Sequence, residues 1–267
     1  MNCWRKKLES ELARYDRLAI AFSGGCDSAL LAAAALRQLG GDNVLLLLAD
    51  SELLPRVESE RARRLAEGFG LRLEVVRLDP LSDPAVRENG PQRCYHCKKR
   101  LFAAIQERAR DLGFPRLADG ANRDDRGDYR PGARAADELG ILHPLSELPK
   151  SAIRELAREL DVPVWNLPAA ACLASRIPTG TPLNRAALAA VEAGERALAA
   201  LGYSGFRVRR LRPESARLEL RPEEMERGER ERTESCSRLR ACGFSAVEAA
   251  RYRTGSMNRP TGCSNKA

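Results

Sequence analysis

The first half of the chain alternates short apolar runs with longer segments whose apolar residues recur at helical spacing. Four apolar runs have the length of buried strands: Leu18–Phe22, Val44–Ala49, Leu73–Leu78 and the shorter Arg116–Ala118. The helical spacing predicts helices over Asp27–Leu39, Glu58–Phe69, Leu101–Leu112 and Lys150–Leu160. Strands that alternate with helices predict an α/β fold, in which a parallel sheet is covered by helices on both faces.

The pattern changes after Pro163. The stretch Val164–Pro182 contains several prolines and Gly180, so it is predicted to be a linker or an active-site loop. Beyond it the pattern predicts a helix over Arg185–Leu201, strands over Phe206–Leu211 and Ala216–Leu220, and a charged helix over Glu223–Ala241. We therefore expect a larger domain over 1–165, a small α+β domain over 166–259 and a disordered polar tail over 260–267.

Composition places the chain among globular proteins, because 43% of its 267 residues are hydrophobic. Its 45 Lys and Arg against 37 Asp and Glu give a net charge of +8, which suits nucleotides, phosphorylated metabolites or RNA but equally an ordinary solvated surface. No apolar window has the length of a membrane helix and the charged N-terminus lacks a signal sequence, so we expect a cytoplasmic protein. Eight cysteines in that compartment favour metal binding or catalysis over disulfides.

A glycine-rich loop, Ser23–Ser28 (SGGCDS), joins the first predicted strand to the first predicted helix. Its two glycines let the backbone approach a ligand closely, and the helix amides that follow form an anion site. Asp27 would repel a phosphate unless a cation lay between them, so we expect it to coordinate Mg²⁺. The spacing matches neither the GxxxxGK[ST] loop nor the GxGxxG fingerprint, and the alternative is a plain glycine turn.

This loop resembles the SGGxDS loop of the PP-loop ATP pyrophosphatases, the superfamily of GMP and NAD synthetases and tRNA thiolases. The resemblance implies a Rossmann-like parallel sheet of the adenine nucleotide α-hydrolase-like type. It also implies that ATP is cleaved between its α- and β-phosphates and that the loop holds the leaving pyrophosphate. The second strand ends where such folds receive the base or ribose. The expected ATP-binding residues are Ser23, Gly24, Gly25, Asp27, Ser28, Asp50 and Ser51.

Three cysteines stand out by their settings. Cys94 and Cys97 form a CxxC that opens a helix, and two thiols at that spacing can bind one metal. A closed zinc site would need distant ligands, since no second CxxC is present and the only histidine outside this motif is His143. Cys172 lies on the irregular stretch, where Arg176 would favour its thiolate or an anionic substrate. The alternatives are a zinc staple or ordinary buried thiols.

Four further segments together indicate a more specific family within this superfamily. They follow one another in the same order over nearly the whole chain: Arg93–Lys98, Asp119–Gly132, Cys172–Pro182 and Tyr252–Asn258. Together they look like the LarE-type ATP-dependent sulfur transferases. The resemblance implies that the substrate is the pyridinium dicarboxylate mononucleotide on the route to the nickel-pincer nucleotide cofactor. One of its carboxylates would be adenylated and then converted to a thiocarboxylate.

The resemblance places the sulfur-donor cysteine of this family on Cys172. Some members give up their own cysteine sulfur and keep dehydroalanine, whereas others carry three cysteines and resemble thiolases with a [4Fe–4S] cluster. With Cys94, Cys97 and Cys172, this chain looks like the three-cysteine type, so the expected cofactors are ATP, Mg²⁺ and a [4Fe–4S] cluster. Asp27, Cys172 and Arg176 are the expected catalytic residues.

The second domain is expected to bind the substrate or its phosphate. The residues concerned are Ser175, Arg176, Glu195, Arg207, Arg209 and Glu219. Arg207 and Arg209 share one face of their strand, although a solvated strand face would show the same pattern. Two residues depart from the family pattern, Cys26 in the loop and Glu248 near the end, and neither receives a role.

Two other functions remain open. A tRNA thiolase would use the same chemistry on a base, but the chain has no basic run interleaved with aromatic residues. A non-catalytic iron–sulfur or zinc module could bind ATP as a regulator, but it would not need Asp27. We therefore expect ATP and a small anionic nucleotide as partners rather than nucleic acid or a membrane. The sequence leaves open a homo-oligomer and any role for Cys236, Cys242 and Cys263.

Overall fold

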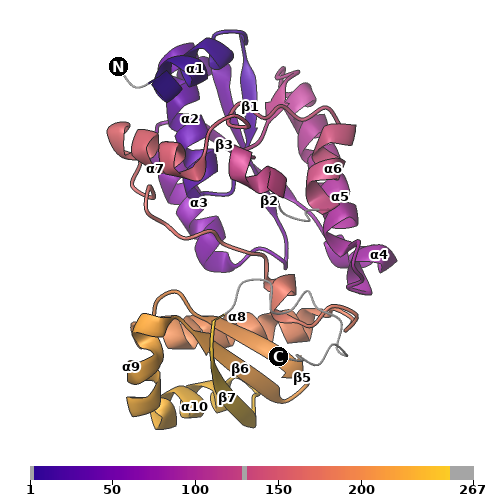
Figure 1. Ribbon diagram of the computed structural model, residues 1–267. Helices are drawn as coiled ribbons and strands as arrows, with labels where there is room; N and C mark the ends of the chain where they lie inside the picture. Colours follow the sequence, from indigo (N-terminus) through magenta and orange to yellow (C-terminus); the bar gives the residue numbers. More distant parts are fainter. Residues whose placement is uncertain (1–2, 128–130, 253–267) are drawn as a thin grey trace. The chain divides into compact units, whose positions relative to one another are not determined.

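The computed structural model describes residues 3–127 and 131–252 (Figure 1). Contacts divide the chain into two compact units: Met1–Asp79 with Cys94–Ala170, and Pro80–Arg93 with Ala171 onward. The chain therefore passes between the units after Asp79, Arg93 and Ala170. The sequence pattern had suggested one boundary, near residue 165. Within the described residues, none of the helices combines the length and the apolar character needed to cross a bilayer.

The larger unit is built on a parallel sheet, which confirms the predicted α/β class. Its strands are β1 (Leu18–Ala21), β2 (Val44–Asp50), β3 (Arg72–Arg77) and β4 (Leu117–Ala118), in the order β3-β2-β1-β4. All the pairings are parallel. A further parallel bridge joins Ala118 to Leu142, so the backbone before His143 continues the sheet beyond β4.

Helices cover both faces of this sheet. They are α1 (Cys3–Leu12), α2 (Cys26–Leu39), α3 (Arg56–Gly68), α5 (Arg93–Asp111), α6 (Pro131–Glu138) and α7 (Lys150–Glu159), with short 3-10 turns at Gly41–Asn43 and Arg123–Gly127. Figure 1 shows α5 and α6 on one side of the sheet and α1, α2, α3 and α7 on the other. The sequence did not predict α1 or α6, and α5 begins at Arg93, at the CxxC that was expected to open a helix, so it extends the predicted Leu101–Leu112 helix toward its N-terminus.

The alternation of side chains along the strands explains the two-sided core. Leu18 and Ile20 of β1 pack with Leu46 of β2 against the face covered by α1, α2, α3 and α7. Their neighbours Ala19 and Leu45 point the other way, onto Phe102 and Ile105 of α5. Successive residues of a strand face opposite sides, so strands buried on both faces appear as continuous apolar runs.

The smaller unit pairs one sheet with helices. Its elements are a 3-10 turn at Pro80–Ser82, α4 (Pro84–Arg87), a 3-10 turn at Leu173–Arg176, α8 (Arg185–Ala200), β5 (Arg207–Arg212), β6 (Ser215–Leu220), a 3-10 turn at Pro222–Glu224, α9 (Met225–Arg230), α10 (Arg232–Ala241) and β7 (Ala246–Arg251). The sheet order is β5-β6-β7, antiparallel between β5 and β6 and parallel between β6 and β7. The predicted helix over Glu223–Ala241 is wrong, because the chain breaks at Glu231 into α9 and α10.

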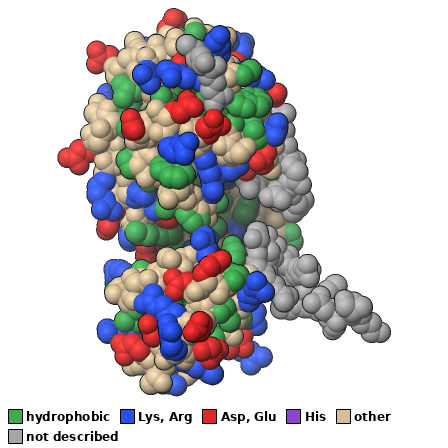
Figure 2. All heavy atoms as spheres, turned by 60° about the vertical axis from the view of Figure 1, so that its left-hand side comes forward, with side chains coloured by type: hydrophobic (Ala, Val, Ile, Leu, Met, Phe, Trp, Pro, Cys, Tyr) green, Lys and Arg blue, Asp and Glu red, His purple; other side chains and the backbone are tan. Residues whose placement is uncertain are grey.

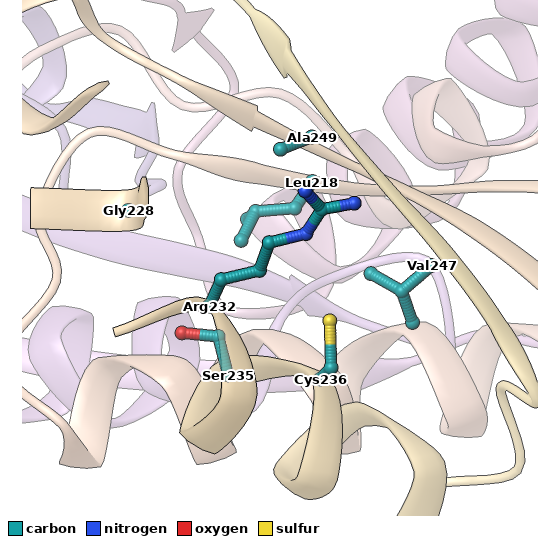
Figure 3. A pocket seen from close by; sticks show the side chains of 7 residues that line it. All are labelled: Leu218, Gly228, Arg232, Ser235, Cys236, Val247 and Ala249. Carbon is teal, nitrogen blue, oxygen red and sulfur yellow. The ribbon is translucent and has the colours of Figure 1, made fainter. Parts of the chain in front are cut away.

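A small, mostly apolar pocket lies between the sheet of this unit and its last two helices. Its lining consists of Leu218, Gly228, Arg232, Ser235, Cys236, Val247 and Ala249. Figure 3 shows Arg232 extending from α10 toward β6 and the sulfur of Cys236 directed toward the strands. Cys236, which received no role from the sequence, therefore faces the packing layer of this unit.

Candidate active site

The predicted phosphate loop lies between β1 and α2, as its sequence indicated. Gly24 has φ +70°, and a Cβ there would lie 2.8 Å from the Cα of Ala62 in α3, so only glycine fits. The Ser23 and Ser28 hydroxyls lie 3.2 Å apart. Gly25, the N-cap residue of α2, provides no side-chain cap, so the first amides of this helix remain available to a ligand. Hydroxyls and free amides at a helix N-terminus are groups that can donate to an anion such as a phosphate.

Asp27 makes an ion pair that the sequence did not predict. Both of its carboxylate oxygens lie 2.6 Å from Nζ of Lys150, the first residue of α7. The two side chains are about one quarter exposed, so ligands in solution can reach them. Lys150 places a positive charge beside the anion site and offsets the charge of Asp27. The only sequence signal for Lys150 was its position at the start of a predicted helix.

The segment after β4 lies directly against the phosphate loop. A Cβ on Gly120 would lie 3.0 Å from both Asp27 Cβ and Ser28 N, so the Gly120 backbone is packed against the start of α2. Asp124, farther along the segment, accepts a hydrogen bond from the Lys150 backbone N–H at 2.9 Å. The segment Asp119–Gly132, which carried part of the family resemblance, thus supports the phosphate loop; its residues 128–130 lie outside the described residues.

Asp50, the expected base or ribose contact, lies at the end of β2. Its carboxylate is 2.7 Å from Arg56 Nη1 and 4.0 Å from Arg63 Nη2. Arg56 also donates to the carbonyl of Ser51. Arg61, one helical turn beyond Arg56, donates from Nε to the Gly24 carbonyl at 3.1 Å. Arginines of α3 that the sequence did not single out therefore hold both the end of β2 and the phosphate loop.

Cys26, the unusual thiol of the loop, is buried. Its Sγ donates a hydrogen bond to the Trp165 carbonyl at 3.4 Å. Burial raises the pKa of the Cys26 thiol, opposed in part by the charge of Lys150. A protonated, buried thiol is a poor nucleophile, so Cys26 packs the loop in place of the apolar residue expected there.

Arg176, in the smaller unit, organises the backbone that carries Cys172. Its guanidinium pairs with Glu195 at 2.9 and 3.1 Å and donates to the carbonyl of Cys172 at 3.1 Å. It also donates to the Ala171 carbonyl. The Ser175 hydroxyl donates to the same Cys172 carbonyl at 2.7 Å. Arg176 thus contacts the Cys172 backbone, while Cys172 itself is exposed.

Arg207 and Arg209 differ in burial although both belong to β5. Arg209 is buried and pairs with the buried Glu219 of β6 at 2.9 Å, and it also donates to the Ser175 carbonyl at 2.6 Å. Arg207 is half-buried, and burial together with the charge of Arg176 lowers its pKa. Hydrogen bonds thus join five of the expected substrate residues of this unit, whereas Arg207 is linked to Arg176 and Glu195 only through their charges. The five are Ser175, Arg176, Glu195, Arg209 and Glu219.

The three cysteines expected to bind a cluster belong to two units. Cys94 and Cys97 lie three residues apart in the first turns of α5, on one face of the helix, and are partly buried. Cys172 belongs to the smaller unit. Neither unit, in its described part, gathers three or more His, Cys, Asp or Glu side chains that could hold a metal. Cys263 and the Tyr252–Asn258 segment beyond Tyr252 lie outside the described residues.

Comparison with known proteins supports the family that the sequence motifs indicated. The NAD synthase family model matches residues 3–111. The pyridinium-3,5-bisthiocarboxylic acid mononucleotide synthase of Lactiplantibacillus plantarum is 38% identical over 80% of this chain and 78% of its own. An uncharacterized protein of Synechocystis sp. is 38% identical over 83% and 82%. The tRNA-specific 2-thiouridylase of Brucella suis is 32% identical over 55% of this chain and 46% of its own. The chain therefore belongs to the LarE-type ATP-dependent sulfur transferases, within the PP-loop ATP pyrophosphatase superfamily.

Proposed function

We propose that this enzyme adenylates a carboxylate of pyridinium-3,5-dicarboxylate mononucleotide, releases pyrophosphate and converts the acyl adenylate to a thiocarboxylate. The observation that carries the proposal is the uncapped start of α2 after Gly24 and Gly25, beside the Asp27–Lys150 pair. The relationship to a synthase of the bisthiocarboxylic acid mononucleotide supports this acceptor.

The phosphate loop would hold the β- and γ-phosphates of ATP. Helix amides and the Ser23 and Ser28 hydroxyls donate to phosphate oxygens, and the Lys150 ammonium adds a positive charge. Asp27 fits a magnesium ligand, since Mg²⁺ in such sites takes one or two carboxylates together with substrate phosphates. The ion would neutralise charge on the leaving pyrophosphate. Lys150 would then release one Asp27 oxygen and turn toward phosphate.

The chemistry has two steps. A substrate carboxylate oxygen attacks the α-phosphorus of ATP, the bond from that phosphorus to the β-phosphate bridging oxygen breaks, and pyrophosphate leaves. Sulfur then attacks the acyl carbon and AMP leaves. If Cys172 is the donor, its thiolate forms a thioester, and loss of the α-proton with cleavage of the Cβ–Sγ bond gives the thiocarboxylate and dehydroalanine. Arg176 and Ser175 would orient the Cys172 backbone for this attack.

The second possible sulfur source is a sulfide carried by a [4Fe–4S] cluster, which we propose is held by Cys94, Cys97 and Cys172. Two thiols on one face of α5 suit two ligands of one metal centre, and a third ligand would complete the cluster while leaving one iron open. Iron and sulfide analysis with Mössbauer spectroscopy of anaerobic protein tests this, with each cysteine changed to Ala. Loss of the cluster in all three variants supports it. Iron-free protein whose mass falls by one sulfur after a turnover overturns it.

The adenylation step is tested by product analysis. We expect AMP and pyrophosphate, formed faster when the pyridinium dicarboxylate mononucleotide is present. Asp27→Ala should abolish turnover, whereas Asp42→Ala, at an exposed carboxylate of the same unit, should leave it unchanged. ADP and orthophosphate as products would overturn the proposal.

A tRNA thiolase is the competing function. The match to the thiouridylase covers little more than half of this chain. On the face shown in Figure 2, Lys and Arg side chains are interspersed with Asp and Glu rather than gathered into one basic area. Stimulation of ATP consumption by bulk tRNA, with none from the mononucleotide, would replace our proposal by this function.

A further inference from the structure

His143 lies between two carboxylates of the larger unit. Its Nδ1 is 2.7 Å from Asp119 Oδ1, and its Nε2 is 3.2 Å from Asp137 Oδ1. A neutral imidazole carries one N–H and can donate to only one of them, while the imidazolium donates to both. The geometry therefore points to a charged His143 that bridges Asp119, after β4, and Asp137 of α6.

The surroundings favour that charge. The hydrogen bond to Asp119 raises the pKa of His143, and Asp137 adds to the rise, against the opposing effect of burial. Among the described residues, Asp119 and Asp137 are the charged groups that act on the ring. With a raised pKa, His143 is charged below about 6.5 and loses its proton only above that value.

Asp119 connects the histidine to a turn. Its Oδ1 also accepts a hydrogen bond from the Ala121 N–H at 3.0 Å, and its own N–H donates to the Leu142 carbonyl at 2.9 Å. The carboxylate is only 11% exposed, so water replaces a lost donor poorly. The neutral ring can keep its single N–H on this carboxylate, so deprotonation removes the positive charge of that contact and the bond to Asp137 rather than the Asp119 hydrogen bond itself. The hold on the turn that Asp119 begins is therefore weaker without the proton.

That turn lies on the phosphate loop. Gly120 packs so closely on Asp27 and Ser28 that a Cβ there would approach both to 3.0 Å. A shift of a few tenths of an ångström in the turn changes the contact with the first residues of α2. The α2 amides and Asp27 are the groups proposed above to bind the phosphates and magnesium, so their placement depends on where Gly120 lies.

We propose that His143 is a positioning residue of the ATP site. As an imidazolium it holds Asp119, and through Asp119 the Gly120 turn, against the start of α2. The neutral ring keeps one N–H for Asp119 but loses its charge and the bond to Asp137, so it holds the turn less firmly and weakens ATP binding. This inference rests on the proposed function, because it assumes that the loop binds ATP. It also gives a role to a histidine that the sequence offered only as a distant zinc ligand.

The direct test is an NMR titration of the whole chain without nucleotide. The protein has two histidines, so His143→Gln identifies the His143 resonances. We expect a midpoint above 6.5 and the same midpoint in the amide shifts of Gly120, Ala121 and Ser28. Those amide transitions should vanish in His143→Gln. Amides that do not follow the His143 titration, or that still titrate in His143→Gln, would overturn the proposal.

The second test measures ATP affinity against pH. A lost charge-assisted contact corresponds to a change of about tenfold, so wild-type affinity should fall by about that factor as the pH rises through the His143 midpoint. His143→Gln should be weak at every pH, and His143→Arg, a permanent cation, should stay tight with no step. A wild-type profile in His143→Gln would overturn the proposal. If the wild type binds no ATP at any pH, the proposed function fails, and the amide titration alone decides whether His143 holds the turn.

Discussion

Lys150 neutralises the charge of the Asp27 carboxylate at the start of α2. A carboxylate at the N-terminus of α2 competes with phosphate for the same amides, and the Lys150 ammonium, 2.6 Å from both oxygens, neutralises that competitor. In the function proposed above, the same ammonium would turn to a phosphate oxygen once Mg²⁺ and ATP bind. The proposal thus gives Lys150 a part in ATP binding, although it lies 123 residues from Asp27 in sequence.

Replacing Lys150 tests this role. Lys150→Met removes the charge and keeps most of the side-chain volume, so we expect ATP turnover to fall at least tenfold. Because the pair is partly exposed, the free energy of unfolding should change by about 1 kcal/mol or less. Steady-state pyrophosphate release and urea denaturation measure the two effects. A fall in turnover accompanied by a fall in the free energy of unfolding large enough to account for it would show that Lys150 serves the fold and not the ATP site.

Gly120 offers a steric test of the same site. Gly120→Ala puts a methyl group 3.0 Å from Asp27 Cβ and Ser28 N, and we expect ATP affinity to fall several-fold. Gly68→Ala is the matched control: its Cβ would meet nothing within 4 Å, and it lies in the last turn of α3. That change should leave ATP affinity unchanged and stability unchanged or slightly higher. Isothermal titration calorimetry with ATP compares the two variants.

At the residue scale, the sequence predicted the part of the site that lies in one continuous stretch. Ser23–Ser28 is one stretch after a strand, and its spacing alone predicted an anion site. Lys150 and Arg61 reach that loop from other segments, and His143 contacts Asp119 beside it; each is an ordinary polar residue in its own stretch. Their roles come from tertiary contacts, which one sequence does not display.

At the scale of elements, β5 and β6 are joined by a buried ion pair. Arg209 and Glu219 are 6% and 2% exposed, and Arg209 also holds the Ser175 carbonyl. Burying two charges is costly, and their geometry recovers the cost only while both are present. These residues, expected to bind substrate, are therefore also bound to each other within the sheet of the smaller unit.

Glu219→Gln tests that structural contribution. It removes the charge that Arg209 faces in β6, and we expect the smaller unit to lose about 3–5 kcal/mol of stability. The matched control is Glu248→Gln on β7, whose partner Arg217 is 36% exposed; there we expect a loss below about 1 kcal/mol. Hydrogen exchange of the β5 and β6 amides compares the two. A native exchange rate in Glu219→Gln would show that Glu219 does not stabilise this sheet.

The sequence predicted regular elements better than irregular ones. Apolar runs marked β1 and β2 because both of their faces are buried. The run Ala246–Arg251 gave no such signal, because β7 leaves most of its side chains at least partly exposed. The charged stretch over α9 and α10 looked continuous, but the chain leaves the helical conformation at Glu231. Gly228, inside α9, packs so closely on Leu220 that a Cβ would clash with its side chain.

At the scale of the whole molecule, the smaller unit depends on Pro80–Arg93, a segment far from the rest of it in sequence. Asn89 is fully buried with φ +57°; its Nδ2 donates at 2.9 Å to the carbonyls of Pro178 and Thr181. Its own carbonyl accepts the Gly180 N–H at 2.8 Å. Because these hydrogen bonds join Pro80–Arg93 to the segment after Ala170, a single boundary near residue 165 does not separate the two units.

Asn89→Ala tests how far the smaller unit depends on Pro80–Arg93. It removes two donors and leaves a β-carbon in the left-handed region, for a combined loss of about 2–4 kcal/mol. Asp161→Ala, at an exposed residue with φ +54° in the larger unit, is the control that carries the backbone strain alone. Hydrogen exchange at Gly180 should accelerate strongly in Asn89→Ala and remain native in Asp161→Ala. Unchanged exchange in both would remove Asn89 from the stabilising contacts of the unit.

The passage of the chain between its two units constrains how such a gene can be recombined. A single crossover near codon 170 would bring in a foreign partner for Pro80–Arg93, and the hydrogen bonds of Asn89 would meet a sequence that did not evolve with them. A viable exchange needs two inserted pieces, one of them inside the coding region of the larger unit. The smaller unit is therefore expected to diverge by point substitution, and chimaeric enzymes should be built with both segments moved together.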